Sequence, residues 1–167
     1  MGIWKTIITD VDGVLTDGSF MYSEEGKYAK RFGPHDADAV KFFNKLGVNI
    51  IAISADKRGF GITSKRLQDM NVKLLLISES ERLDWITKNF SSNEIAFIGD
   101  GYHDIGALKY ASVGFTPENA LEIVKNNADI VLATSGGNGV LFEVFSYFLK
   151  TYYPDKYIRF SEGIFDE

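Results

Sequence analysis

Short apolar runs alternate along this chain with longer amphipathic stretches, and this alternation limits the fold more than any other sequence feature. Apolar runs of roughly 4–8 residues between turn signals indicate buried strands. Strands that alternate with helices favour a parallel sheet covered by helices. We therefore expect an α/β fold, a Rossmann-like three-layer arrangement around a parallel sheet. The expected strands span 3–9, 48–54, 72–77, 94–98, 112–115 and 130–132, and the expected helices 36–46, 57–70, 80–90, 103–110, 118–126 and 139–152. We expect Asp36 to cap the N-terminus of the first helix and Gly47 to follow its C-terminus.

One segment interrupts the alternation. Residues 19–32 read as a β-hairpin with its turn at Glu24-Glu25-Gly26. No insertion elsewhere is long enough for a separate cap domain, so we expect one domain over 1–167. The tail over 154–167 has no clear period, and termini are often disordered. Four large apolar residues in this tail favour docking on the body of the protein.

Composition narrows the class of protein. A chain of 167 residues with 45% hydrophobic residues suits a globular domain. With no cysteine, it has no disulfide, thiolate metal site or cysteine nucleophile. A net charge of −5 argues against nucleic acid as the main partner. The chain shows neither a leader nor a run long enough to cross a membrane, so we expect a cytoplasmic protein with no membrane partner.

Two carboxylates stand one residue apart where the first strand ends. Asp10 and Asp12 precede Gly13, and residues two apart near a strand end point the same way. Two anions so close repel each other unless a cation or a shared proton compensates. A hard cation such as Mg²⁺ takes oxygen ligands and fits this pair. The alternative is an ordinary Asx turn, since Asp-Gly is common in turns.

A second acidic cluster follows a later strand. Asp100 stands where the strand over 94–98 ends, and Asp104 falls just inside the next expected helix. A turn with an N-cap would explain this cluster alone. Two acidic strand ends together favour one ligand site outside the carboxyl end of the sheet, where open α/β folds place ligands.

In these motifs the chain resembles the haloacid dehalogenase superfamily of phosphohydrolases. It is more closely similar to the cap-less branch that dephosphorylates 3-deoxy-octulosonate 8-phosphate and related sugar acids. The motifs that carry the resemblance are Asp10-Val11-Asp12-Gly13-Val14-Leu15-Thr16-Asp17-Gly18 and Gly99-Asp100-Gly101-Tyr102-His103-Asp104, with support from residues 32–36, 117–120, 128–129 and 136–139.

The resemblance implies roles for the acidic residues. Asp10 would attack phosphorus and form an aspartyl-phosphate, and Asp12 would protonate the leaving oxygen and later activate water. Mg²⁺ would be held by Asp10, the backbone carbonyl of Asp12, and Asp100, with Asp104 supporting the site. Ser54 matches the family's phosphoryl-binding Ser or Thr.

Arg82 falls where the family normally has a lysine, and the two cations differ in shape and reach. The alternative is an exposed helix charge paired with a nearby glutamate. The resemblance assigns substrate contact to Gly13, Ser54, Ala55, Arg82 and His35.

Two departures concern the substrate. Ser54-Ala55-Asp56 stands where many members of the branch have Thr-Gly-Arg, and Phe142 stands where they have an arginine before the glutamate of the last helix. Both changes remove positive charge. We therefore expect weak use of octulosonate 8-phosphate, because an acid beside the pocket disfavours an anionic substrate.

The leading hypothesis is a Mg²⁺-dependent phosphatase for a small phosphorylated sugar acid. The alternatives are a phosphatase for another phosphomonoester, such as a nonulosonate 9-phosphate, and a non-catalytic oligomerising domain. The resemblance also implies a homotetramer with the hairpins joined at its centre. Phe20, Tyr22 and Tyr28 fit such packing, although they would equally cover a flank of their own subunit.

Overall fold

The protein is a three-layer α/β structure around a parallel sheet, as the sequence predicts. The structure, a computed structural model, describes residues 2–165; residue 1 and the end of the predicted tail, 166–167, lie outside the described residues. The strands run in the order β5-β4-β1-β6-β7-β8, and every neighbouring pair is parallel. Their bounds are β1 Thr6–Asp10, β4 Asn49–Ser54, β5 Lys73–Leu76, β6 Ile95–Ile98, β7 Val113–Thr116 and β8 Ile130–Val131.

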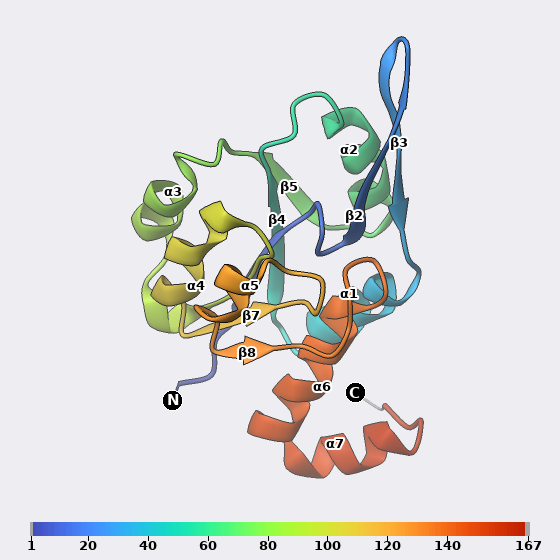
Figure 1. Cartoon of the computed structure of the whole chain (residues 1–167). Coiled ribbons are helices and arrows are strands. Elements are labelled where there is room, and N and C mark those ends of the chain that lie inside the picture. The colour runs from blue at the N-terminus through green and yellow to red at the C-terminus, as the bar shows by residue number, and fades with distance from the viewer. Residues whose placement is uncertain (1, 166–167) are drawn as a thin grey trace.

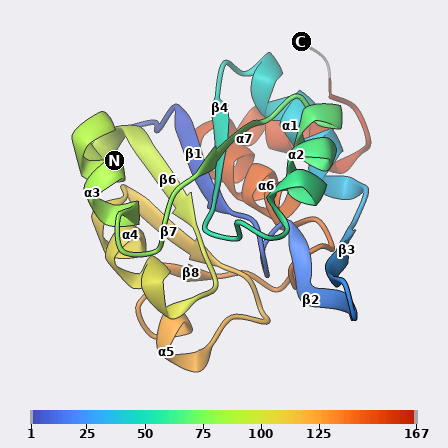
Figure 2. The ribbon, with the colours of Figure 1, turned by 90° about the horizontal axis from the view of Figure 1, so that it is seen from above.

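Helices cover both faces of the sheet (Figure 2). Successive strand residues point to opposite faces, so Ile7 of β1 joins one core cluster and Ile8 joins the other. The first cluster contains residues of α1 (His35–Lys45), α2 (Phe60–Asp69) and α6 (Val140–Tyr152). The second contains residues of α3 (Arg82–Asn89), α4 (Ile105–Tyr110) and α5 (Glu122–Lys125). Two 3₁₀ turns, η1 (Ser92–Glu94) and η2 (Tyr102–Asp104), precede β6 and α4.

Several helix boundaries differ from the predictions by a few residues, and two of these differences involve Asn119 and Asp36. The predicted helix over 118–126 is too long, because Asn119 instead donates its side-chain amide to the Gly13 carbonyl at 2.9 Å and so holds the loop after β7. Asp36, predicted as a helix N-cap, lies inside the first turn of α1, and Pro34 precedes the helix. The predicted C-terminal Gly47 is confirmed, with the positive φ of 71° that glycine tolerates.

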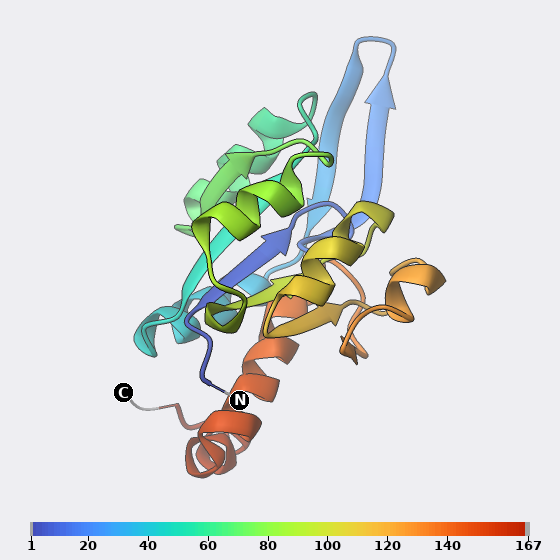
Figure 3. The same ribbon diagram turned by 90° about the vertical axis from the view of Figure 1, so that its left-hand side faces the viewer.

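The hairpin projects beyond the carboxyl edge of the sheet (Figures 1 and 3). Strands β2 (Thr16–Ser23) and β3 (Gly26–Phe32) pair antiparallel around Glu24 and Glu25, which confirms the predicted turn. Phe20, Tyr22 and Tyr28 are 43%, 56% and 59% exposed. Tyr22 and Tyr28 are thus mostly exposed on the hairpin, whereas Phe20 also lies over Lys27 of its own chain.

The tail docks on the body, as its apolar residues predict. Helix α7 (Pro154–Ser161) follows α6 after a single residue and brings Phe160 onto the first core cluster. The Phe160 ring centroid lies 5.3 Å from that of Phe145 and 5.6 Å from that of Phe142. Among the described helices, none has both the length and the apolar character needed to cross a membrane.

Asp36 is a buried carboxyl that joins two helices. It is 2% exposed, and its Oδ1 accepts a hydrogen bond from the backbone N–H of Leu141 at 2.8 Å, at the start of α6. Its Oδ2 is buried and has no hydrogen-bond partner among the described residues. Burial raises the pKa of Asp36 to about 6, although backbone hydrogen bonds from Leu141 and Gly139 oppose the shift.

We predict that Asp36→Asn becomes more stable relative to the wild type as pH rises from about 4 to about 7. A carboxyl whose pKa is raised from 3.8 to about 6 on folding binds its proton more tightly in the folded state. Its contribution to stability is therefore fully present below the unfolded pKa and is lost as pH rises through the folded value. The full difference is roughly 3 kcal/mol, at about 1.4 kcal/mol per pKa unit. Urea denaturation at a series of pH values measures it. Asp38→Asn, on the same helix but at the surface, is the control, and an equal pH trend in both variants would contradict the prediction.

Candidate active site

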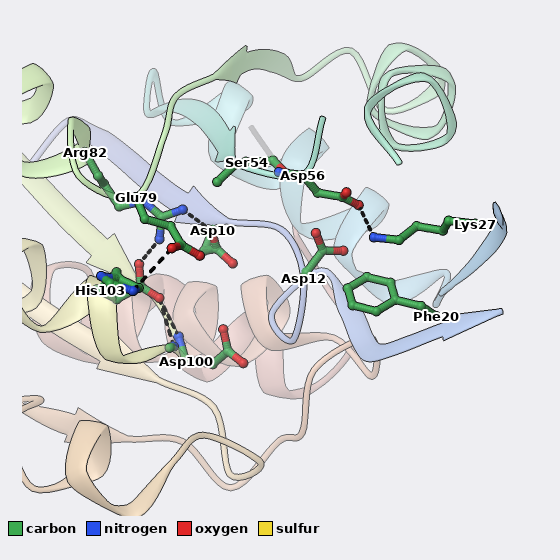
Figure 4. A pocket seen from close by; sticks show the side chains of 13 residues that line it. Asp10, Asp12, Phe20, Lys27, Ser54, Asp56, Glu79, Arg82, Asp100 and His103 are labelled. Carbon is green, nitrogen blue, oxygen red and sulfur yellow. Dashed lines mark hydrogen bonds and ion pairs between the residues drawn. The ribbon is translucent and has the colours of Figure 1, made fainter. Parts of the chain in front are cut away.

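The carboxyl ends of the three central strands open into one pocket of about 370 Å³ (Figure 4). Strand β1 supplies Asp10, β4 supplies Ser54, and the loop after β6 supplies Asp100. The hairpin closes one side. The lining residues are Asp10, Asp12, Phe20, Lys27, Ser54, Ala55, Asp56, Glu79, Arg82, Asp100, Gly101, His103 and Asp104.

Three carboxylates converge at the floor of this pocket. One oxygen each of Asp10, Asp100 and Asp104 lies within 4.8 Å of the others. Burial raises the pKa of Asp10 well above its usual value, and the charges of Asp104, Asp100 and Asp12 add to that shift while Arg82 opposes it. Burial, then the charges of Asp104 and Asp12, raise the pKa of Asp100 to about 7. The two acidic strand ends therefore share one site, as the sequence predicts.

The donor set fits a hard divalent cation. Oxygen ligands from several carboxylates are what Mg²⁺ prefers, and a cation among them would relieve their mutual repulsion. Gly13 has a positive φ of 90°, and a Cβ at this position would collide with the Asp100 carboxylate. The glycine thus lets Asp100 approach the end of β1.

Asp104 is held by the protein on both of its oxygens. Its Oδ2 accepts hydrogen bonds from the backbone N–H groups of Asp100 and Gly101, each at 3.0 Å, and its Oδ1 accepts one from Arg82. Such hydrogen bonds suit a carboxylate that orients a neighbouring metal ligand without necessarily binding the metal itself.

Arg82 lies at the start of α3 and points into the cluster. Its Nη2 is 2.8 Å from Oδ1 of Asp10, and its Nη1 contacts Asp104. Burial opposes its charge, but Asp10 and Asp104 outweigh burial and raise the pKa of Arg82. The alternative of an exposed helix charge is therefore wrong, since Arg82 is only 4% exposed.

Two lysines from the hairpin reach the same pocket, and the sequence analysis missed both. Lys30 lies 2.7 Å from Asp12 and 2.8 Å from Asp56, and Lys27 donates a hydrogen bond to Asp56 at 2.6 Å. In a regular strand, residues three apart face opposite sides. In β3, however, Ala29 and Lys27 pair with the consecutive residues Met21 and Tyr22, so a bulge brings both lysines to one side. A bulge of this kind has no clear sequence signal.

The expected weak use of octulosonate 8-phosphate assumed that Asp56 is an unpaired acid beside the pocket. The two lysines show that this assumption is wrong. Burial opposes the charge of Asp56, but hydrogen bonds from Lys27 and Lys30 outweigh burial and hold the pKa of Asp56 well below its usual range. The side chain of Asp56 is thus an anion already paired with two cations. It does not present an uncompensated negative charge to a substrate.

The remaining predicted residues divide into two groups. Ser54 and Ala55 line the pocket, and the Ser54 hydroxyl accepts a hydrogen bond from the backbone N–H of Asp56 at 3.1 Å. Gly13 has already used its N–H on Thr16 Oγ1 at 3.1 Å, so it is not free to bind substrate there. His35 was predicted to contact substrate, but it lines a separate cavity beside Phe142.

Glu79 and His103 face each other across the rim of the pocket, with 3.2 Å between Glu79 Oε2 and His103 Nε2 (Figure 4). Both side chains are about half exposed. His103 therefore occupies the pocket rim.

The chain is similar to known proteins in both sequence and fold. Residues 85–144 match the model of the haloacid dehalogenase-like hydrolases. A 3-deoxy-D-manno-octulosonate 8-phosphate phosphatase of Haemophilus influenzae, KdsC, is 32% identical over 145 residues, which cover 84% of this chain and 79% of that protein.

Solved structures show the same fold. The cobalt-bound form of the deoxy-D-mannose-octulosonate 8-phosphate phosphatase from Haemophilus influenzae has a TM-score of 0.80 and 29% identity, over 95% of this chain and 93% of that one. The corresponding phosphatase from Moraxella catarrhalis, in complex with a magnesium ion, a phosphate ion and KDO, has a TM-score of 0.82 at 23% identity, over 96% and 92% of the two chains. At that identity the likeness shows the fold alone.

We predict that Arg82→Met lowers the free energy of unfolding by about 3 kcal/mol or more in metal-free buffer, because it leaves Asp10 and Asp104 buried without their cation. Adding Asp104→Asn should restore part of this loss, since the two residues are in contact and their effects are not additive. Chemical denaturation of both variants and of Asp104→Asn alone measures the coupling. Strictly additive effects would contradict the contact.

Proposed function

The chain belongs to the haloacid dehalogenase family of phosphatases, and on that premise we propose that it hydrolyses a small phosphorylated sugar acid with Mg²⁺ as its cofactor. The observation that carries the proposal is the convergence of Asp10, Asp100 and Asp104 on one side of a pocket whose other side presents Asp12. The relative from Haemophilus influenzae, at 32% identity, acts on a phosphorylated sugar acid by its name.

Asp10 is the proposed nucleophile. One oxygen of Asp10 forms a bond to phosphorus while the bond from phosphorus to the sugar oxygen breaks. Asp12, in its protonated form, gives its proton to that departing oxygen. Asp12 then takes a proton from water, the water oxygen attacks phosphorus, and the Asp10–phosphorus bond breaks to release inorganic phosphate. Asp10 returns to its starting state.

Negative charge on the phosphoryl oxygens needs positive partners in this reaction. We assign this role to Arg82, and its contacts with Asp10 and Asp104 in the pocket support the assignment. The Ser54 hydroxyl accepts a hydrogen bond from the backbone N–H of Asp56, so its own O–H can donate to a phosphoryl oxygen.

Mg²⁺ would be held by Asp10, Asp100 and the backbone carbonyl of Asp12, with Asp104 supporting Asp100. When bound, the ion supplies positive charge beside the phosphoryl oxygens. The oxygen-rich donor set supports this assignment, and the relative with 29% identity is known in a cobalt-bound form.

The relatives support this substrate class, and the proposed substrate is an octulosonate 8-phosphate or another phosphomonoester such as a nonulosonate 9-phosphate. A non-catalytic oligomerising domain is the alternative of a different class. The complete set of Asp10, Asp12, Asp100 and Asp104 in one pocket favours the enzyme, since a domain without turnover has no need of it. A cytoplasmic location stays a prediction.

We further propose that the protein assembles as a homotetramer through its hairpins. Phe20, Met21, Tyr22 and Tyr28 are large side chains that are between 41% and 59% exposed, and the hairpin that carries them projects from the body of the protein (Figure 3). Exposed apolar patches of this kind mark interaction sites. A neighbouring subunit would then help to close a pocket over which residues 2–165 form no cap domain.

We predict that Asp10→Asn abolishes phosphate release from phosphorylated sugar acids while its thermal unfolding stays cooperative. EDTA should abolish phosphate release by the wild type, and added Mg²⁺ should restore this activity. A panel of phosphorylated sugar acids, with released phosphate as the readout, measures both effects. Wild-type rates in Asp10→Asn, or full activity in EDTA, would overturn the proposed function.

We predict that the double variant Tyr22→Ser, Tyr28→Ser dissociates the tetramer, because it removes two of the most exposed apolar side chains of the hairpin. Light scattering measures the molar mass. Ile158→Ser, an equally exposed apolar position on α7, is the control and should leave the mass unchanged. An active wild-type monomer would contradict the proposed assembly.

A further inference from the structure

The buried ammonium of Lys30 lies between the proposed acid, Asp12, and the loop after β4. From this juxtaposition we propose that Lys30 is the positioning residue that orients Asp12 for proton transfer, and that Asp56 is its anchor. This inference rests on the proposed function, because it assigns a partner to the proton donor of that reaction.

Lys30 has a complete set of partners. Its side chain is fully buried, and an ammonium has three N–H donors. It donates to Asp12 Oδ2 at 2.9 Å and to Thr63 Oγ1 at 2.9 Å, and it lies 2.8 Å from Asp56 Oδ2. Three donors thus meet three side chains from three different parts of the chain. With every donor engaged, the ammonium has one position, and the carboxyl of Asp12 is fixed against it.

The Lys30 ammonium determines the direction in which the O–H bond of protonated Asp12 points. Lysine can donate hydrogen bonds but cannot accept them. A proton on Asp12 therefore cannot be shared with Lys30, which lies within 3 Å of both carboxyl oxygens. The O–H of Asp12 must point away from Lys30, and the open side of Asp12 is the pocket.

Asp56 is held as firmly as Lys30. Its Oδ1 accepts a hydrogen bond from the backbone N–H of Gly59 at 3.0 Å, and its Oδ2 meets both Lys27 and Lys30. Lys27 in turn lies 3.5 Å from the centre of the Phe20 ring. Figure 4 shows Asp56, Lys27 and Phe20 lined up beside Asp12.

Gly59 leaves the space that this network occupies. A Cβ at Gly59 would collide with the Asp56 carboxylate and with the side chain of Lys30. The aspartate at position 56 thus has a physical purpose inside the protein, which is to hold the hairpin lysines against the sheet.

Proton donation matters only when the leaving oxygen is a poor leaving group. A sugar alkoxide needs the proton of Asp12 as its bond to phosphorus breaks, whereas p-nitrophenolate departs as a stable anion without it. Loss of a general acid typically costs 10²–10⁴-fold. If Lys30 orients that acid, its loss must slow alkyl phosphates far more than p-nitrophenyl phosphate.

The test is the kcat/KM of Lys30→Met in Mg²⁺ on a phosphorylated sugar acid and on p-nitrophenyl phosphate and acetyl phosphate, whose leaving groups need no proton. We expect a loss of about 100-fold or more on the sugar acid phosphate and of less than about 5-fold on the other two. The control is Arg31→Met, which removes the same charge from the adjacent hairpin residue, 73% exposed and outside the pocket. It should leave all three values unchanged.

Equal losses on all three substrates would overturn the inference while leaving the proposed function intact. A wild type without phosphatase activity would instead overturn the proposed function. If Lys30→Met fails to fold, the same measurement on Asp56→Asn tests the inference. This variant removes the negative charge that holds Lys30, with little change in the shape of the side chain. It should show a smaller loss that is again confined to the sugar acid phosphate, and a uniform loss would count against the inference.

Discussion

Mutual repulsion among carboxylates at the end of β1 is the constraint on which the rest of this structure depends. Asp10, Asp100 and Asp104 bring oxygens within 4.8 Å of one another in a buried place. Such a cluster persists only with compensating positive charge. Arg82 supplies part of it through both Asp10 and Asp104. The remaining negative charge suits the divalent cation that we propose as the cofactor.

The hairpin supplies positive charge to a second pair of carboxylates in the same pocket. Asp12 and Asp56 are also close to each other, and Lys30 lies between them with Lys27 beside Asp56. The pocket therefore has one side formed by the acidic cluster of Asp10, Asp100 and Asp104 and another side on which Asp12 and Asp56 are paired with lysine. Asp10 and Asp12, two residues apart, thus lie in different electrostatic surroundings.

The sequence predicts much of this architecture because its signals are local. Ile7 and Ile8 belong to opposite core clusters, as expected of a strand covered on both faces, and the two Asp motifs end neighbouring parallel strands. The role of Arg82 could be proposed from the sequence, because Arg82 stands where the family has a lysine, and the structure places it beside Asp10. The lysines of the hairpin could not be predicted, because their shared orientation depends on a bulge near Tyr28. Asp36 was misread as a helix cap because its real partner, Leu141, is distant in sequence.

Asp10 is the proposed nucleophile, and trapping the phosphorylated enzyme tests this role most directly. Enzyme mixed with substrate and Mg²⁺ is quenched in acid and treated with borohydride, which reduces an acyl phosphate to an alcohol. Mass spectrometry of the digested protein then locates the reduced residue. We predict homoserine at position 10, with Asp12 and Asp100 unmodified. Turnover without any reduced aspartate, or reduction at Asp12 instead, would contradict it.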